Sequence, residues 1–401
     1  MEPAGPGNPA PRGFLRVGGP QLVRHQLSLA LASRCERIIV MAREFSPETA
    51  ELQRESEQGR AAFHVLTGPR GLASLVTAAD EVLVIADGLL PTTGDALRLL
   101  ETGPAIFVQP AETGIPAGFE RIDLNHASAG MMLLPGRLVE RLMDLPADAD
   151  PASALLRIGL QAGVAQRMIP DEVRLGGRWL LVRTEQEAHT AEDSWMVRHT
   201  AGGPATPGPL LAQFLARRFG PAVLHASATG LAVPYATGYL LALVSLGLAW
   251  LGAAWVGLIL LGLACVIQRT AATLGRLQRE VLAVRSGRAW RSAVSAVVLD
   301  GVIGAVLVLA RVPLPGESLM ARLFPAAVLL GLVRLVPRAF ASGWAVWVSD
   351  RLLLCLLLAA MAAGRVIDQS VPALALLLLF AGLVLNRASY GPGQGTGLTR
   401  A

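Results

Sequence analysis

The sequence contains no lysine, and all 35 of its basic residues are arginines. Chemistry that needs a lysine, such as a P-loop phosphate grip or a Schiff base, is therefore excluded from this chain. The net charge is +5, but the arginines lie beside long apolar stretches, which is typical of topology signals in a membrane protein. We therefore expect contact with membrane lipids and not with nucleic acid.

Cysteine is almost as scarce. The three cysteines lie far apart, without a CxxC pair or a histidine at metal-ligand spacing: Cys35, Cys265 and Cys355. We interpret them as packed or lipid-embedded thiols and not as a disulfide frame or a metal site. The six histidines also lack an HExxH pattern, so a catalytic zinc is not expected.

The two ends of the chain lack apolar patterning. Residues 1–12 are rich in proline, glycine and alanine, without the apolar run of about 7–15 residues that a signal peptide needs. We expect a disordered N-terminus there and a first domain that stays in the cytoplasm. Residues 389–401 are rich in glycine and are predicted to be a disordered tail.

Long apolar stretches are confined to the second half of the chain. Hydrophobic residues make up 53% of the sequence, but up to about Pro221 they form short runs mixed with charges. Beyond it the runs approach the roughly 20 residues that cross about 30 Å of hydrocarbon. We predict an all-α six-helix transmembrane bundle over 223–388, preceded by an amphipathic connector over 189–222. Its six spans are placed at 223–244, 248–266, 292–310, 319–335, 351–367 and 371–384.

The distribution of arginines predicts the orientation of these spans. The segment joining the second and third spans is rich in arginine: Arg269, Arg276, Arg279, Arg285, Arg288 and Arg291. The opposite turns carry few basic residues. The positive-inside rule then places both termini in the cytoplasm, as an even number of spans requires. We expect a multi-pass protein of a bacterial-type inner membrane.

Strands and helices alternate in the first half of the chain, which predicts βαβ units and a mostly parallel sheet. Four apolar runs indicate buried strands, at 37–42, 63–66, 81–87 and 105–108. Ser46 and Pro47 predict a helix start, with the serine as N-cap and the proline in the first turn. We expect this α/β domain to cover 13–188.

The residues of this half resemble a MobA-like or sugar-phosphate nucleotidyltransferase domain, over roughly 13–191. The resemblance is carried by Arg16-Val17-Gly18-Gly19, Leu22, Arg24-His25-Gln26-Leu27, Val82-Leu83-Val84-Ile85-Ala86-Asp87, Ser128-Ala129-Gly130, Leu133-Leu134 and Asp150-Pro151-Ala152-Ser153-Ala154-Leu155-Leu156-Arg157. It implies a Rossmann-like α/β fold.

The second half resembles the six-helix membrane domain of CDP-alcohol phosphotransferases. The run Asp193-Ser194-Trp195-Met196-Val197-Arg198-His199 is similar to the amphipathic lead-in of proteins that fuse the two families. Such fusions make a CDP-activated polyol phosphate and join it to a second alcohol phosphate. The resemblance also implies a homodimer.

The metal-binding motif of these phosphotransferases, D-G-x2-A-R-x8-G-x3-D-x3-D, is degenerate here. Its acids hold the divalent metals that neutralise a pyrophosphate. The best gapless placement sets Asp300 at the final Asp and Glu280 at the family's common acid after D-G. The remaining motif positions fall on Gln278, Arg279, Leu282, Ala283, Ser292 and Ala296, and an upstream Asp falls on Gly275. One metal carboxylate survives, and Arg279 puts a cation where the metal belongs.

The nucleotidyltransferase half lacks its phosphate-binding residues as well. The resemblance implies a first strand, a G-x-G-T-R loop whose amides hold a triphosphate, and then a lysine. The residues before Val17 do not contain that loop. The alternative of a longer natural N-terminus that carries the loop stays open, and it would reopen an enzymatic role for the first domain alone. Asp87 stands where the family keeps a metal-binding Asp, although Asp followed by Gly is equally typical of a turn.

Asp300 and Asp87 are therefore the candidate catalytic remnants, and Arg334, Arg338 and Arg279 are the candidate lipid or phosphate ligands. An acid inside a span is a functional candidate by default, but Asp300 is also expected to pair with an arginine or to line a cavity. The arginines are alternatively expected to extend to lipid headgroups. Asp350 and Arg351 are interpreted as an interfacial pair.

Three hypotheses remain open. The chain is a catalytically inactive homologue of the fused enzymes, serving as a subunit or regulator in phospholipid or polyol-phosphate metabolism, which the loss of both motifs favours. Alternatively it is an active CDP-alcohol phosphotransferase-type enzyme with an atypical site, or a lipid-binding or transport-type protein. No cofactor is expected, and Mg²⁺ only if an ancestral site persists. The expected partners are membrane lipids, a second copy of the chain or an active paralogue.

Overall fold

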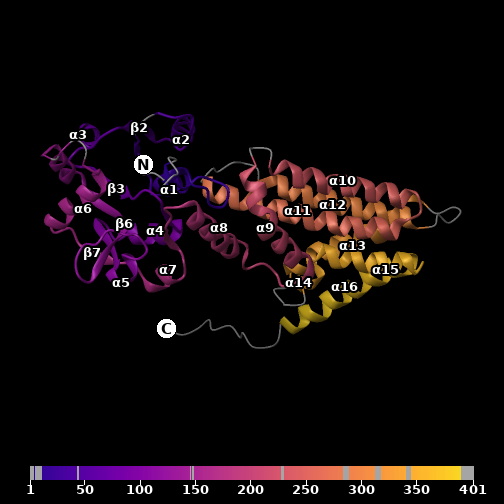
Figure 1. Cartoon of the computed structure of the whole chain (residues 1–401). Helices are drawn as coiled ribbons and strands as arrows, with labels where there is room; N and C mark the ends of the chain where they lie inside the picture. The colour runs from indigo at the N-terminus through magenta and orange to yellow at the C-terminus, as the bar shows by residue number, and fades with distance from the viewer. Residues whose placement is uncertain are drawn as a thin grey trace, which may run out of the picture. The chain divides into compact units, whose positions relative to one another are not determined.

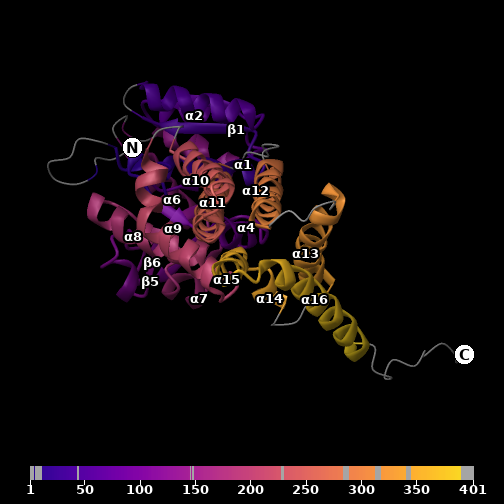
Figure 2. The same cartoon turned by 90° about the vertical axis from the view of Figure 1, so that its right-hand side faces the viewer.

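The computed structural model describes residues 4, 11–42, 45–144, 146, 149–226, 230–282, 289–311, 318–339 and 345–389. The side chains of 279–282, 289–292, 338–339 and 384–389 also lie outside the described part. The chain forms two compact units: unit 1 is Met1–Arg198 with Leu277–Arg285, and unit 2 is His199–Arg276 with Ser286–Ala401 (Figures 1 and 2). Most of the predicted disordered ends, 1–12 and 389–401, lies outside the described residues.

Unit 1 is an α/β domain, as the alternating pattern predicts. Its described strands are β1 (Arg37–Met41), β2 (Ala62–Leu66), β3 (Glu81–Ile85), β4 (Leu89–Pro91), β5 (Ala105–Pro110), β6 (His126–Pro135), β7 (Gln166–Met168) and β8 (Trp179–Leu181). They form three sheets, with the orders β1-β2, β3-β6-β5-β7 and β4-β8. The four predicted strands are present as β1, β2, β3 and β5.

The four-stranded sheet is mixed, so the prediction of a mostly parallel sheet is wrong in this part. β6 runs antiparallel to both of its neighbours, β3 and β5, while β7 is parallel to β5. The sequence gives a weak signal for β6, because Gly130 interrupts the strand pattern. In the structure this glycine has a φ of 74°. β1 and β2 do pair in parallel.

Alternation along β5 and β6 builds two apolar layers, one on each face of this sheet. Phe107 and Met131 belong to one buried cluster, and Ile106 and Leu134 belong to the other. Because successive side chains of a strand point to opposite faces, helices must cover both sides. The described helices of unit 1 are η1 (Arg12–Phe14), α1 (Leu22–Ala32), α2 (Pro47–Gln58), α3 (Arg70–Leu75), α4 (Thr93–Leu100), α5 (Ala111–Gly114), η2 (Gly136–Asp144), α6 (Pro151–Gln161), α7 (Asp171–Leu175) and α8 (Glu185–Thr200).

The start of α2 shows the predicted local chemistry. The Ser46 side chain accepts a hydrogen bond from the Thr49 backbone N–H at 3.3 Å, and the Thr49 hydroxyl accepts one from the Ser46 N–H at 2.8 Å. This reciprocal capping box satisfies two amides that would otherwise lack partners, and Pro47 takes the first turn.

Unit 2 is helical. Its described helices are α9 (Pro207–His225), α10 (Ala232–Trp250), α11 (Ala254–Leu282), α12 (Ala289–Ala310), α13 (Leu319–Ala339), α14 (Ala345–Val348), α15 (Arg351–Ala363) and α16 (Ile367–Ser389). Four of them are long and apolar enough to cross a membrane: Ala232–Trp250, Ala254–Gln278, Ala293–Ala310 and Leu319–Pro337. Figures 1 and 2 both show α10, α11 and α12 side by side.

Two predicted span boundaries are wrong. The first span begins at Ala232 and not at residue 223, because α9 continues to His225 and Gly230 makes a close turn after it. A Cβ at Gly230 would lie 2.1 Å from the Val223 carbonyl oxygen. The second span begins at Ala254, because Gly252 (φ 84°) terminates the preceding helix.

The arginine-rich segment after the second span is also partly helical. α11 continues to Leu282, so Arg269 and Arg276 lie on a helix and not in a connecting loop. Arg269 is inside the candidate span Ala254–Gln278. Arg285 and Arg288 lie outside the described residues, as does the side chain of Arg291.

The last two predicted spans correspond to shorter apolar helices, Arg351–Ala363 and Ile367–Leu383. α15 has 13 residues, which gives it a length of only about 20 Å at 1.5 Å per residue. The count of six spans therefore stays a prediction, whereas four candidate spans are present.

The interior of unit 2 is apolar and contains many small residues. Alanines such as Ala242, Ala264 and Ala359 are buried there beside Leu258 and Leu358. The outward faces also carry large apolar side chains, including Leu240, Leu243, Phe324 and Phe380. An apolar exterior around a packed interior is the arrangement that hydrocarbon requires of a membrane domain.

Candidate functional site

Asp300 lies near the middle of α12 and is 7% exposed. Its carboxylate accepts two hydrogen bonds from Arg351 on α15, Nε to Oδ1 at 2.8 Å and Nη2 to Oδ2 at 2.9 Å. Arg334 on α13 donates a third, from Nε to Oδ2 at 2.5 Å. A bidentate guanidinium is the strongest common partner of a buried carboxylate. The cluster joins three helices and carries one more positive than negative charge.

Asp350 is the second buried acid of this region, with 2% exposure. It is the N-cap of α15, and its Oδ1 accepts the Leu352 backbone N–H at 2.9 Å. Its Oδ2 accepts the Gly208 N–H from the first turn of α9 at 2.8 Å. A Cβ at Gly208 would lie 2.3 Å from Oδ1, so only glycine permits this approach. Asp350 therefore acts as a joint between α9 and α15.

A neutral polar chain connects α10, α11 and α12. The Ser295 hydroxyl donates to Gln268 Oε1 at 3.0 Å, and Gln268 Nε2 donates to the Tyr235 carbonyl oxygen at 3.2 Å. Gly238 makes room for the amide, because a Cβ there would lie 2.7 Å from Gln268 Cγ. Buried polar groups inside a span need such partners.

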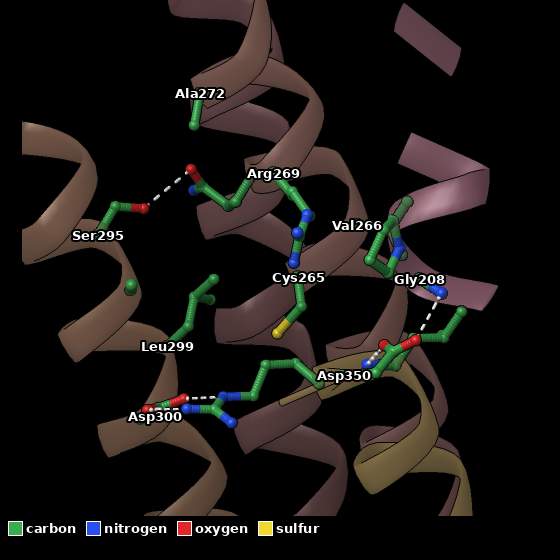
Figure 3. Close-up of a pocket in the computed structure, with 14 residues that line it drawn as sticks. Gly208, Cys265, Val266, Arg269, Ala272, Ser295, Leu299, Asp300 and Asp350 are labelled. Atoms are coloured by element: carbon green, nitrogen blue, oxygen red, sulfur yellow. Dashed lines mark hydrogen bonds and ion pairs between the residues drawn. The ribbon is translucent and has the colours of Figure 1, made fainter. Parts of the chain in front are cut away.

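These groups surround a cavity of about 210 Å³ between α9, α11, α12 and α15 (Figure 3). Its polar lining consists of Gln268, Arg269, Ser295, Asp300, Asp350 and Arg351. The remaining walls are mostly small or aliphatic side chains, among them Cys265, Ala272 and Leu299.

Arg269 differs from the other charged residues of the pocket. Figure 3 shows its side chain extending into the space above Cys265, on the side facing Asp350. Among the described residues, no ion pair joins its guanidinium to a carboxylate. The Asp350 carboxylate of the same pocket acts on the Arg269 charge through space, without a direct ion pair between them.

The predicted candidates fall into separate places. Asp300 and Arg334 meet in the ion cluster, whereas Asp87 belongs to unit 1. The side chains of Arg338 and Arg279 lie outside the described residues, as does that of Glu280. Asp350 and Arg351 do not form the expected interfacial pair, because Arg351 reaches Asp300 and Asp350 caps its own helix.

Asp87 follows β3 in a tight turn of unit 1. Gly88 has a φ of 82°, and a Cβ there would lie 2.3 Å from the Val182 carbonyl oxygen. Gln26 donates to the carbonyl oxygens of Ala86 and Leu89 on either side of the turn, at 2.9 Å each. The local structure is therefore a turn that α1 holds in place.

The glycine pair near the start of unit 1 is covered by α8. The Gly18 N–H donates to the buried Glu192 carboxylate at 2.9 Å. Trp195 packs so closely that a Cβ on Gly18 would lie 2.6 Å from its ring. The same indole meets the His25 ring edge to face, with 6.2 Å between centroids. A carboxylate, and not a phosphate, is the anion bound to this amide.

Sequence reasoning missed Arg269 and the Gln268–Ser295 pair as parts of one site. The available signal for Arg269 was its position inside a long apolar helix, where a charge is rare. Within the described part of the chain, no group of three His, Cys, Asp or Glu residues is placed to hold a metal ion. Neither the protein-family models nor the curated proteins gave a match to this chain.

Proposed function

We propose that this chain is a catalytically inactive relative of fused nucleotidyltransferase and CDP-alcohol phosphotransferase proteins. It serves as a membrane-bound subunit or regulator in phospholipid or polyol-phosphate metabolism. The observation that carries the proposal is the state of Asp300, the one acid at a metal position of the motif with a described side chain. Two arginines engage both of its oxygens.

Two properties of the Asp300 cluster argue against metal binding there: the carboxylate oxygens already have partners, and those partners are positively charged. Mg²⁺ requires hard oxygen ligands at near-ideal octahedral geometry, and two-metal sites need several carboxylates. The oxygens of Asp300 are already bound to Arg351 and Arg334, whose charges repel a divalent cation. Guanidinium groups therefore occupy the place beside the carboxylate that a metal would need.

The pocket also supports a second placement of the phosphotransferase motif, with extra residues between its two parts. In this placement the D-G-x2-A-R part lies on α11 at Ala271-Ala272-Thr273-Leu274-Gly275-Arg276, and the upstream acid falls on Gln268. The second part keeps Ser292, Ala296 and Asp300 on α12. Gln268, Ala272, Ala296 and Asp300 then line one pocket, as the residues of one site should. In this placement the other motif acids are replaced by alanines and an amide.

The nucleotidyltransferase half supports the same conclusion through Gly18. An amide that holds a phosphate must be free to donate to it. The Gly18 amide is bound to Glu192 and lies beneath Trp195, both from α8. Nucleotide binding at this loop would require α8 to move.

We further propose six spans, an inner-membrane location and cytoplasmic termini. This orientation puts Arg311 and Arg322, which lie between the third and fourth proposed spans, on the non-cytoplasmic side. Both are engaged in local structure, which supports the orientation. Arg322 donates to the Val308 carbonyl oxygen at 2.9 Å at the end of α12. Arg311 pairs with Asp368 at 2.9 Å. Neither arginine acts as a bare topology signal. The proposed partners are a second copy of the chain or an active paralogue.

The test is release of CMP by the full-length protein in lipid nanodiscs. CDP-alcohols are supplied with an alcohol phosphate acceptor and Mg²⁺ or Mn²⁺, and an active CDP-alcohol phosphotransferase serves as positive control. We expect no release above protein-free nanodiscs. Metal-dependent release that EDTA abolishes would overturn the proposal and favour an enzyme with an atypical site. A stable complex with the active paralogue would support the role as a subunit.

A further inference from the structure

Two of the three cysteines lie on helices of unit 2 that pack against each other. Cys265 is on α11 and Cys355 is on α15, and both are free thiols. Cys355 is buried in the apolar core cluster of unit 2, and Cys265 packs against the same cluster. Cys35, by contrast, belongs to unit 1. Folding therefore brings together two cysteines that are far apart in the sequence.

A glycine lets α11 and α15 approach closely beside these cysteines. A Cβ added to Gly262 on α11 would lie 3.2 Å from the Cβ of Cys355 and 3.1 Å from Cδ1 of Leu352. Small residues at a helix crossing permit such a short distance between two helices. Cys265 follows Gly262 by three residues, and residues three apart lie on the same face of a helix. Cys265 therefore faces α15 about one turn from the point of closest approach.

The two thiols are near enough to interact, and a side-chain hydrogen bond joins Cys355 to Cys265. A disulfide requires Cα atoms within about 7 Å of each other and Cβ atoms about 3.5–4.5 Å apart. A close crossing of two helices brings facing residues into this range. A disulfide between these thiols therefore calls for rotation of the side chains, and the helices can keep their positions.

The two thiols differ in their access to a reagent. Cys265 lines the cavity of about 210 Å³, whereas Cys355 is 0% exposed and is not among the lining residues (Figure 3). A water molecule takes up about 30 Å³, so the cavity is large enough for a small neutral molecule. An accessible thiol with a second thiol directly behind it is typical of a redox-sensing pair.

We propose that Cys265 and Cys355 form a redox modification site, which a small peroxide oxidises to a disulfide that joins α11 to α15. The Cys265 sulfur attacks one oxygen of the peroxide, the O–O bond breaks, and a sulfenic acid and water are formed. The Cys355 sulfur then attacks the sulfenic sulfur, the S–S bond forms, and the hydroxyl leaves with the thiol proton as a second water. One hydrogen peroxide and two thiols thus give one disulfide and two waters, and the two electrons lost by the sulfurs reduce the peroxide.

The disulfide would act on the pocket as well as on stability. Cys265 is part of the pocket lining, and α15 begins with Asp350 and Arg351, which also line it. A covalent link between the two helices fixes this wall. It also closes a long loop in the unfolded chain, which stabilises the folded state. The proposal is independent of the proposed function, because neither cysteine falls on a position of the phosphotransferase motif.

The experiment exposes the full-length, reduced protein in lipid nanodiscs to hydrogen peroxide. Peptide mass spectrometry detects a Cys265–Cys355 cross-link, and dimedone traps any sulfenic acid. C265S removes the attacking thiol, and C355S removes the thiol that resolves the sulfenic acid. C35S is the matched control, because it removes a thiol of unit 1 that takes no part in the pair.

We expect the wild-type protein and C35S to form the cross-link within one chain, and dithiothreitol to reverse it. The oxidised protein should unfold at a temperature several degrees higher than the reduced protein, as closure of a long loop predicts. C355S should lose the cross-link and accumulate a sulfenic acid on Cys265. C265S should leave Cys355 unmodified, because that thiol does not line the cavity.

Absence of the cross-link from peroxide-treated wild-type protein would overturn the proposal. A cross-link that forms only after unfolding in detergent, or a sulfenic acid on Cys355 instead of Cys265, would overturn it as well. The cross-link in the wild-type protein requires no substitution, so this test does not depend on how well the serine variants fold. Release of CMP in the assay above would reject the proposed function and leave the cysteine pair standing.

Discussion

The two units differ in where most of their ion pairs lie. In unit 1 most of the described pairs lie near the surface, such as Arg37 with Asp80, whose side chains are 38% and 31% exposed, and the exception is the buried Asp95, which Arg98 and Arg178 bind. In unit 2 the Asp300 carboxylate is 9% exposed and is held by arginines from two other helices. Exposed pairs contribute at most about 1 kcal/mol because water competes for them. Loss of one partner of a buried pair leaves a charge that the interior cannot solvate.

The comparison teaches where function should be sought in this chain. Apolar residues fill the interior of both units, so their presence identifies no site. Polar residues inside unit 2 are costly and must be retained for a packing joint or for a ligand. Asp300 and Asp350 belong to the first kind, because their partners are present. Arg269 fits neither kind as clearly, because it has no ion pair among the described residues and only the Asp350 carboxylate acts on its charge through space.

The largest effect is expected from Asp300→Ala. It leaves Arg334 and Arg351 without their common anion, and breaking a buried pair in this way costs about 3–5 kcal/mol. The measurement is the unfolding free energy of the full-length protein in detergent. Joint replacement of Asp300, Arg334 and Arg351 by leucine or methionine should recover most of the loss. If the single variant were as stable as the wild type, the ion cluster would not hold the helices together.

Asp350→Ala should have the next largest effect. It removes the cap of α15 and the acceptor of the Gly208 N–H, for which we expect a loss of about 2 kcal/mol. Asp350→Asn is the matched variant, because its amide oxygen can still accept the Leu352 N–H whereas its NH2 group cannot accept the Gly208 N–H. Thermal unfolding of both variants therefore separates the cap of α15 from the joint to α9. Equal loss in both would show that the joint or the charge, and not the cap, carries the effect.

Asp80→Asn in unit 1 should have a small, pH-dependent effect. The Thr77 backbone N–H, then the Thr77 hydroxyl, and then Arg37 lower the pKa of the Asp80 carboxyl. A depressed folded-state pKa contributes stability above the ordinary value near 3.9 and loses it as the pH falls through the folded value. Hydrogen exchange in β1 and β3 should therefore differ between variant and wild type at pH 7. A difference that persisted at strongly acidic pH would contradict this origin.

Arg269→Gln should cause no loss of stability. Its guanidinium has no ion pair to lose among the described residues, and the Asp350 carboxylate that acts on it keeps its own backbone hydrogen bonds. Thermal unfolding in phosphate-free detergent with EDTA gives the measurement, with Asp300→Ala as the destabilised reference. A loss as large as that of the reference would mean that Arg269 is structural, which would remove the contrast drawn above.

Much of the architecture was predictable because it depends on local pattern. The apolar runs after about residue 221, the strands near Ile39 and Val84, and the Ser46 cap each follow from neighbouring residues. The antiparallel course of β6 was not predictable in this way, since Gly130 interrupts its pattern and its partners are distant. The first two span boundaries failed because turns at Gly230 and Gly252 interrupt hydrophobic sequence.

In the candidate site, too, the sequence indicated individual residues but not the contacts between them. The sequence singled out Asp300 and Arg334 separately, because each is a charge within or beside a span. It could not pair them, since the partners of Asp300 lie 34 and 51 residues away in the chain. It also assigned Arg351 to the wrong partner, because an adjacent acid suggested a local pair.

The sequence by itself determined that this protein has an α/β half and a hydrophobic helical half, because composition and periodicity are properties of short segments. It also excluded lysine-dependent chemistry, since no fold can supply a residue that the sequence does not contain. The tertiary structure alone decided which charges are neutralised and which are not. That outcome depends on the packing of α11, α12, α13 and α15, which brings distant side chains within hydrogen-bonding distance and leaves Arg269 beside a cavity.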